Sequence, residues 1–368
     1  MSRSIYVAAG GGGDALASLM LAPAGSASAP IVLSYSWDRY LIDPNPGPRT
    51  PADFQGLARL TRNCWEVTPE SSLPAGGVSG LTLLARHAEA RFVLIDPGGG
   101  AEGIRVQISE LLDHFRADDL VLVDVGGDVA AHGTESTLLS PLADALTLAA
   151  VAMAEAPATV AILGPGLDGE LPAHQVRDDL TRAGAKQLRL RPSDVDPHLS
   201  CLNVHPSEAT LLVAAAAKGL HGRAEIRDKG ALVTLSSGSA DMFLLPAVAV
   251  LEINEVAAAL TGTHSFGDAE RRTEAICGRT ELDHERRKAA ALAHGRPAEP
   301  TAAELRRLAT DYCAAAARRG VDLITFRKLT EAIGKHHYDP PAVRELVGAL
   351  AFPDLPLLRT CHDWRSVS

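Results

Sequence analysis

The sequence lacks the paired cysteines, the long apolar runs and the excess of positive charge that mark several common protein classes. Its five cysteines lie far apart with no C-x-x-C pair, which argues against a zinc knuckle or a disulfide scaffold and favours a reducing compartment. The net charge of −10 argues against a nucleic-acid or anionic-membrane surface. No apolar run reaches the roughly 20 residues that span a bilayer, and the N-terminal stretch lacks a signal-peptide pattern. We therefore expect a cytoplasmic protein whose partners include neither nucleic acid nor membrane.

Three catalytic motifs are also absent. The sequence contains no G-x-S-x-G elbow, no H-E-x-x-H zinc motif and no G-x-x-x-x-G-K-[ST] phosphate loop. Each motif positions the groups on which its chemistry depends, so serine hydrolases, zincins and P-loop kinases lose support.

Short apolar runs alternate with helical patterns from the start of the chain to about residue 253. This alternation is typical of a parallel sheet with crossover helices, and the continuous apolar character of the runs indicates strands that are buried on both faces. We therefore predict an α/β fold with a doubly wound, mostly parallel, Rossmann-like sheet. The expected strands cover residues 4–9, 31–35, 92–96, 120–124, 159–163, 231–235 and 248–253, with a weaker candidate at 64–67.

The strand signal nearly stops after residue 253. Helical patterns follow at residues 269–294, 302–319 and 341–350, with one candidate strand at 323–326 and a helix-breaking stretch at 295–301. We expect a Rossmann-like domain over residues 1–253 and a mostly helical C-terminal part over residues 254–368 that packs on the site. Residues 38–52 are rich in Pro and Gly and form a loop that is long enough to act as a lid.

The first expected strand runs into four glycines and an aspartate before a helix begins. Gly10, Gly12 and Ala15 satisfy G-x-G-x-x-[GA], which in a dinucleotide fold brings backbone amides to a pyrophosphate. Asp38 lies near the place, about 20 residues on, where such folds carry an acidic residue for a ribose hydroxyl. The Asp14 carboxylate would oppose a phosphate unless a metal or a hydroxyl intervenes. The predicted ligand-binding residues here are Gly10, Gly11, Gly12, Gly13, Asp14 and Asp38.

Three further glycine-rich loops follow expected strands. The carboxyl ends of parallel strands meet at one edge of a sheet, so these loops should converge with the first. Turn geometry alone explains a single loop of this kind. Four such loops together favour one crevice that binds an anionic small molecule. In it, glycines let backbone amides approach the ligand, and aspartates offer oxygen ligands. The predicted ligand-binding residues in these loops are Gly98, Gly99, Gly126, Gly127, Gly166 and Asp168.

Asp124 and Asp128 are separated by a V-G-G turn and are the predicted metal ligands. Mg²⁺ takes one or two protein carboxylates and fills its other positions with water and phosphate oxygens. The alternative is that Asp124 caps the turn and Asp128 is solvated. Asp128, Glu135 and His132 are the candidate catalytic residues, since Glu135 and His132 lie in a loop without an evident structural task. The start of a helix explains His205 better than catalysis does.

Three strings of residues resemble an uncharacterised prokaryotic family known only as a domain of unknown function. They are GGGGDA after the first strand, LVDVGGDVAAHGTESTLLSPLADAL at 122–146 and GRTELDHERRKA at 278–289. The resemblance spans nearly the whole chain and implies no activity. It implies that Asp124, Asp128, Glu135, Ser140 and Asp144 belong to one pattern, and that residues 280–286, Glu281 among them, line a third wall of the crevice.

Three functions remain open from the sequence. The first is an enzyme that acts on a phosphorylated or nucleotide-like small molecule, with Mg²⁺ assisting transfer or hydrolysis. The second is an NAD(P)-dependent oxidoreductase that uses the turn at Gly10 and Asp38. The third is a non-catalytic nucleotide-binding sensor. The sequence leaves the oligomeric state open, a homo-oligomer included.

Overall fold

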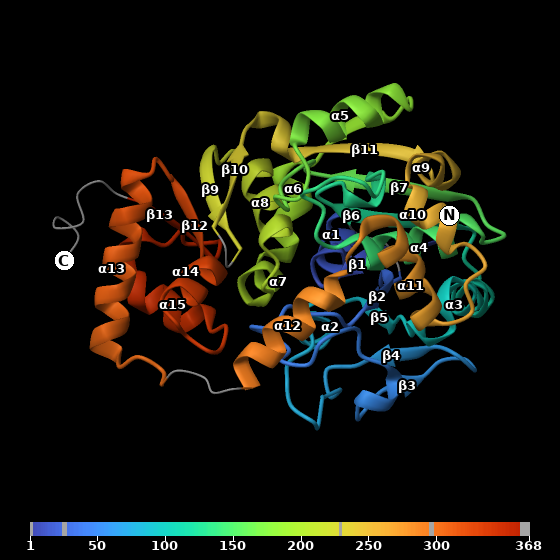
Figure 1. Ribbon diagram of the computed structural model, residues 1–368, viewed down its shortest axis with the longest axis horizontal. Helices are drawn as coiled ribbons and strands as arrows, with labels where there is room; N and C mark the ends of the chain where they lie inside the picture. Colours follow the sequence, from blue (N-terminus) through green and yellow to red (C-terminus); the bar gives the residue numbers. More distant parts are fainter. Residues whose placement is uncertain (1–2, 24–27, 228–229, 294–297, 361–368) are drawn as a thin grey trace.

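A mixed sheet of nine strands forms the centre of the molecule (Figure 1). This computed structural model describes residues 3–23, 28–227, 230–293 and 298–360. The strands are Ser4–Gly11 (β1), Ile31–Tyr35 (β2), Ala58–Arg59 (β3), Trp65–Val67 (β4), Arg91–Leu94 (β5), Asp119–Val125 (β6), Ala158–Leu163 (β7), Lys186–Arg189 (β8) and Asp241–Pro246 (β11). Their order across the sheet is β3-β4-β5-β2-β1-β6-β7-β11-β8.

The central strands β5, β2, β1, β6 and β7 are parallel. The chain adds β2 and β5 on one side of β1, and then returns to add β6 and β7 on the other side. The strand order therefore reverses between β1 and β6, and ligands of open α/β sheets bind beyond the carboxyl ends of the strands at such a reversal. Antiparallel pairs attach β4 and β3 at one edge and β11 and β8 at the other, which makes the sheet mixed.

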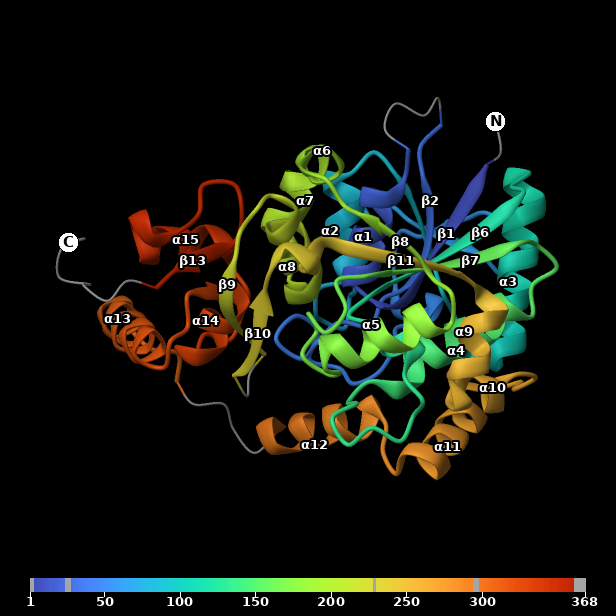
Figure 2. The same cartoon turned by 90° about the horizontal axis from the view of Figure 1, so that it is seen from above.

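Helices cover both faces of this sheet (Figure 2). Alternate residues of β1 enter different cores, with Ile5 and Val7 on one face and Tyr6 and Ala8 on the other. The helices on the Tyr6 face are Gly13–Leu21 (α1), Gly80–His87 (α2), Pro192–Val195 (α6), Leu199–Val204 (α7) and Glu208–Ala217 (α8). Those on the Ile5 face are Gly100–Phe115 (α3), Pro141–Ala152 (α4), Ala173–Arg182 (α5), Ala247–Ile253 (α9), Glu255–Leu260 (α10) and Phe266–Cys277 (α11).

A second sheet of four strands lies beside the first, in the order β10-β9-β12-β13. Its strands are Gly222–Ile226 (β9), Ala231–Leu235 (β10), Leu323–Thr325 (β12) and Leu357–Arg359 (β13). The later helices are Glu281–Ala293 (α12), Ala302–Arg318 (α13), Phe326–Ala332 (α14) and Pro340–Val347 (α15). A small core that includes Cys313, Phe326 and Leu358 joins α13, α14 and β13. Short 3-10 turns lie at Pro51–Asp53, Pro97–Gly99, Asp128–Ala130, Asp196–His198, Ser237–Ala240 and Gly348–Leu350.

The α/β class and the central strands agree with the sequence-based expectation, but residues 248–253 do not. This run forms most of helix α9 rather than a strand. Its apolar, β-branched composition favours a strand, yet Pro246 precedes the helix and Ala247 and Val250 are buried on one side while Val248 is 58% exposed. The predicted strand at 231–235 exists, but it belongs to the four-stranded sheet.

The expected helix over residues 269–294 is two helices. Gly278 has φ 68° and ends α11 in the left-handed conformation, and α12 begins at Glu281. His294 and residues 295–297 of the expected break lie outside the described residues. The four-stranded sheet takes β9 and β10 from before residue 253 and β12 and β13 from after it. Within the described ranges, no helix is both long and apolar enough to cross a membrane.

Candidate functional site

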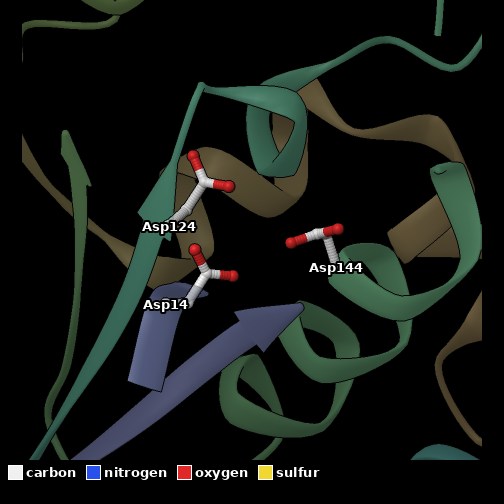
Figure 3. Close-up of side chains that lie close together, drawn as sticks. All are labelled: Asp14, Asp124 and Asp144. Carbon is white, nitrogen blue, oxygen red and sulfur yellow. The ribbon is translucent and has the colours of Figure 1, made fainter. Parts of the chain in front are cut away.

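Three buried aspartates meet where the strand order reverses. Figure 3 shows Asp14 at the start of α1, Asp124 at the end of β6 and Asp144 in the first turn of α4, with their carboxylates turned toward one another. One oxygen from each lies within 4.8 Å of the others, a spacing at which one cation could contact all three. We call Asp14, Asp124 and Asp144 the inner cluster.

Backbone amides hold two members of the inner cluster in place. Asp14 Oδ2 accepts a hydrogen bond from Gly10 N at 2.8 Å, and its Oδ1 accepts one from Val125 N at 3.1 Å. Asp124 Oδ2 accepts from Gly127 N at 2.8 Å. These bonds fix the carboxylates before any ligand arrives, which is how preorganised sites are built.

A second acidic group, here called the outer cluster, consists of Asp128, Asp168 and Glu170. Glu170 is fully engaged: Arg227 Nη2 donates to its Oε1 at 2.8 Å, and Leu139 N donates to its Oε2 at 2.6 Å. Asp168 is different, because within the described part of the chain its buried Oδ2 has no hydrogen-bond partner and lies 4.0 Å from Arg227 Nη2. Glu170 therefore anchors the cluster, whereas Asp168 retains its Oδ2 for a ligand.

Burial and mutual repulsion shift the titration of these carboxylates. Burial raises the pKa of Asp124 to about 6 and that of Asp168 to about 7. The pKa values of Asp14, Asp128 and Asp144 lie well above the ordinary range, first because of burial and then because of neighbouring carboxylates.

Arg227 and Arg39 have the opposite effect on Glu170. Burial alone would raise its pKa, but the two arginines bring it below the ordinary value. Among the residues that the structure describes, neither arginine forms an ion pair with the inner cluster. The inner cluster therefore concentrates negative charge that only protons or a bound cation can offset.

The predicted glycine loops lie close to these clusters, and packing explains several of their glycines. A Cβ atom at Gly11 would overlap the carbonyl oxygen of Trp37, and one at Gly13 would overlap Ser207 Oγ. Gly12, with φ 41°, lies beside Asp38 and His205. The left-handed residues Gly126, Gly127 and Gly166 form the turns after β6 and β7, and a Cβ at Gly126 would lie 2.5 Å from Asp168 Cγ.

The loop after β5 has its own partners. Gly98 N donates to Asp96 Oδ1 at 3.0 Å. A Cβ atom added at Gly99 would have no other described atom within 4 Å beyond its immediate chain neighbours. The first amides of α3 are satisfied by Thr263, whose Oγ1 accepts from Ala101 N at 3.0 Å. A ligand-binding role for Gly98 and Gly99 stays a prediction.

His132 and Glu135 have partners in their own loop and on α5. Both oxygens of Glu135 accept hydrogen bonds from its own loop, from His132 N and Gly133 N at 2.8 Å each. His132 Nε2 is 3.7 Å from Asp179 Oδ2, and its side chain is 45% exposed. These contacts supply the structural task that sequence reasoning did not find for Glu135.

Helix α12 covers the start of α4, where the family resemblance places a third wall. Glu281 Oε1 accepts from Ala143 N at 2.8 Å, and both of its oxygens accept from Leu142 N. Burial raises the pKa of Glu281 to about 7. Glu285, one turn further, accepts from Trp37 Nε1 at 3.0 Å and from Gly47 N at 2.8 Å. The helix thus fastens both α4 and the loop that follows β2.

Sequence reasoning gave no role to several residues of the site. Asp144 follows Ser140 and Pro141, so its position reads as an ordinary helix start. Glu170 stands two residues after Asp168, and that short spacing was the only signal for it. Arg227 comes from the β9–β10 hairpin of the other sheet, with φ 63°, and no local pattern links it to the site.

Comparison with known proteins gives one match. Residues 5–289 match the model of a family described as "Protein of unknown function (DUF1152)". The match includes every member of both acidic clusters and ends before α13, β12 and β13. No curated protein and no solved structure matches the chain.

Proposed function

Since the chain belongs to this family of unknown function, we propose from the site itself that the protein is an enzyme acting on a phosphorylated or nucleotide-like small molecule. A divalent cation such as Mg²⁺ assists the transfer or hydrolysis of the phosphate. The observation that carries the proposal is the convergence of Asp14, Asp124 and Asp144 at the reversal of strand order. We also propose that the sheet is of the doubly wound, Rossmann-like kind, because its parallel strands follow the order β5-β2-β1-β6-β7.

The donor set fits a hard cation. Carboxylate oxygens are the ligands that Mg²⁺ and Mn²⁺ take, and neither cluster contains a histidine or a cysteine. The unbonded Oδ2 of Asp168 is an independent sign of a missing partner, because buried polar atoms are rarely left without one. A bound cation would polarise a phosphate oxygen and offset its charge.

The residues around the cation site have separate tasks in this proposal. The inner cluster holds the cation. Asp168, whose pKa of about 7 lets it gain or lose a proton at neutral pH, takes a proton from the attacking water or hydroxyl. Arg39 is exposed, and its Nη2 lies 3.4 Å from Ser140 Oγ, beside the outer cluster, where it can contact a phosphate. The predicted catalytic residues Glu135 and His132 stay predictions, and the two oxygens of Glu135 accept hydrogen bonds from its own loop.

An assay of phosphate release tests the proposal. Purified protein is incubated with ribose 5-phosphate, AMP, ADP and ATP, each with Mg²⁺, with Mn²⁺ or with neither. We expect cation-dependent turnover of at least one phosphate ester or anhydride, reduced at least 100-fold by Asp124→Asn and by Asp128→Asn. If turnover were unchanged in each of the two variants, the clusters would have no role in the mechanism. Cation-dependent binding without turnover would instead identify a nucleotide sensor.

An NAD(P)-dependent oxidoreductase is a second candidate, favoured by one observation. Asp38 Oδ1 would lie 3.6 Å from a Cβ at Gly12, so the predicted ribose acceptor stands beside the glycine turn. The inner cluster weakens this candidate, because Asp14 occupies Gly10 N and a pyrophosphate there would face three carboxylates. Thermal shifts with NAD and NADP separate the two: stabilisation by either cofactor without a divalent cation favours the oxidoreductase.

A further inference from the structure

Asp38 and His205 meet beside Gly12 of the first glycine loop. A Cβ atom added at Gly80 would lie 2.6 Å from Asp38 Oδ1 and 2.9 Å from His205 Nε2, so both atoms face the same point. Gly12 borders this point from the other side, since its own Cβ would lie 3.6 Å from Asp38 Oδ1 and 3.7 Å from His205 Nε2. Gly12 itself is partly exposed.

The His205 ring has a defined tautomer and an unused donor. Ser207 N donates to His205 Nδ1 at 3.2 Å, so the ring proton resides on Nε2. This Nε2 is buried and has no hydrogen-bond partner among the described residues, and His205 is only 2% exposed. A buried donor without a partner costs stability, so its retention points to a partner supplied by a ligand.

Asp38 offers the complementary acceptor. It is 8% exposed, and its Oδ2 accepts from Gly80 N at 2.8 Å at the first residue of α2. An alcohol can donate to the Asp38 carboxylate and accept from His205 Nε2 at the same time. A phosphate would be repelled by the carboxylate, and a metal at Nε2 would have to displace the proton that the Ser207 bond places there.

We propose that Asp38 and His205 bind a sugar hydroxyl of the ligand whose phosphate lies with the cation at the inner cluster. This inference rests on the proposed function and names its substrate class, a pentose phosphate or the ribose phosphate of a nucleotide. The two subsites border one short segment: a Cβ at Gly10 would lie 3.1 Å from Asp144 Oδ1, and Gly12 borders the pair. Two residues of chain reach roughly 7 Å, a distance that a pentose phosphate spans.

Calorimetry with ribose 5-phosphate and inorganic phosphate as probes, each in the presence of Mn²⁺, tests the inference. The wild-type protein should bind ribose 5-phosphate at least 10-fold more tightly than inorganic phosphate. Asp38→Asn and His205→Phe should each abolish this preference and leave Mn²⁺ affinity within 2-fold. His205→Gln keeps an N–H donor and should retain part of the preference. It also tests the role of His205 if the Phe variant does not fold.

Asp96→Asn is the matched control, because Asp96 caps the turn after the neighbouring strand as Asp38 caps α2. It should leave the preference intact. A wild-type protein that binds Mn²⁺ but shows no preference overturns this inference alone, as does a preference that survives in both Asp38→Asn and His205→Phe. A wild-type protein that binds no Mn²⁺ overturns the proposed function, and this inference falls with it.

Discussion

Arg227 Nη2 lies 2.8 Å from Glu170 Oε1, although the two residues lie in loops that follow strands of different sheets. Arg227 extends from the β9–β10 hairpin, and Glu170 follows β7 in the nine-stranded sheet. Asp168 Oδ2 lies 4.0 Å from the same nitrogen, so one arginine faces two carboxylates. The hairpin therefore contributes directly to the charge balance of the site.

Replacing Arg227 by Met should destabilise the cation-free protein. Glu170 is 2% exposed, and removal of one partner of a buried pair typically costs about 3–5 kcal/mol. Differential scanning fluorimetry should show a fall in Tm of several degrees, with part of the loss restored by Mn²⁺. Arg182→Met is the control, because its side chain is 74% exposed, and it should change Tm by less than about 1 °C. An Arg227→Met protein as stable as the wild type would contradict this role.

The stability of the cation-free protein should fall as pH rises from 6.5 to 8.5. The folded-state pKa of Asp168 is about 7, above its ordinary value of 3.8, so the folded protein holds a proton that the unfolded chain has released. The contribution of this group is complete below its unfolded pKa and is lost as pH rises through about 7. Glu281, also at about 7, acts in the same direction.

Two groups with lowered pKa, Glu170 and His205, change this pH dependence of stability little between pH 6.5 and 8.5. Glu170 is ionised in both states above about pH 5. His205, whose pKa is lowered from 6.5 to about 3, is neutral in the folded state throughout this range, and its unfolded-state proton opposes the trend only at the lower end of it. Saturating Mn²⁺ should reduce or reverse the trend, because the cation binds the ionised carboxylates. Tm measured on chelator-treated protein across this pH range, with and without Mn²⁺, tests the sign. A cation-free protein that gains stability toward pH 8.5 would contradict the raised pKa values.

Gly11→Ala should disrupt the packing of the first glycine loop. The added methyl group would overlap the Trp37 carbonyl, and a backbone atom cannot move as a flexible side chain can. We expect a loss of about 1–3 kcal/mol in the free energy of unfolding, measured by urea denaturation. Gly99→Ala provides the comparison, since nothing lies within 4 Å of its added Cβ and its φ is −87°. If the two variants were equally stable, the loop would accommodate a methyl group at Gly11, which would contradict this prediction.

Glu281→Ala should loosen α12 from the start of α4. The substitution leaves the amides of Leu142 and Ala143 without their acceptor, and loss of such a cap costs about 0.5–2 kcal/mol. Glu281→Gln keeps an acceptor oxygen and should lose less. Hydrogen exchange of the first turn of α4 distinguishes local loosening from global destabilisation, and unchanged exchange in Glu281→Ala would contradict the capping role.

The sequence allows the central strands and two of the three residues of the inner cluster to be anticipated. β2 coincides with the predicted run 31–35, because a short run that begins Ile-Val-Leu between turn residues favours a strand. Asp14 and Asp124 stand in glycine loops at strand ends, where parallel topology brings them together. Glycine-rich turns and the alternation of strands with helices can be recognised in the sequence itself, so these features could be predicted.

The remaining features depend on contacts between distant segments. Asp144 joins the cluster only because α4 packs against β1, and its own sequence context is that of a helix start. Arg227 reaches the site only when β9 and β10 pair and their sheet lies beside the larger one. The strand predicted at 248–253 is wrong because tertiary burial of Ala247 and Val250 outweighs the β-propensity of a Val- and Ile-rich run.

The most direct test of the cation site is the anomalous scattering of Mn²⁺ in crystals soaked with MnCl₂. We expect one strong anomalous peak between the carboxylates of Asp14, Asp124 and Asp144, with metal–oxygen distances of roughly 2.0–2.3 Å. In Asp144→Asn crystals the peak should be lost, while Asp113→Asn, which alters an exposed carboxylate on α3, should keep it. Saturating Mn²⁺ that gives no peak at the inner cluster would contradict the central claim.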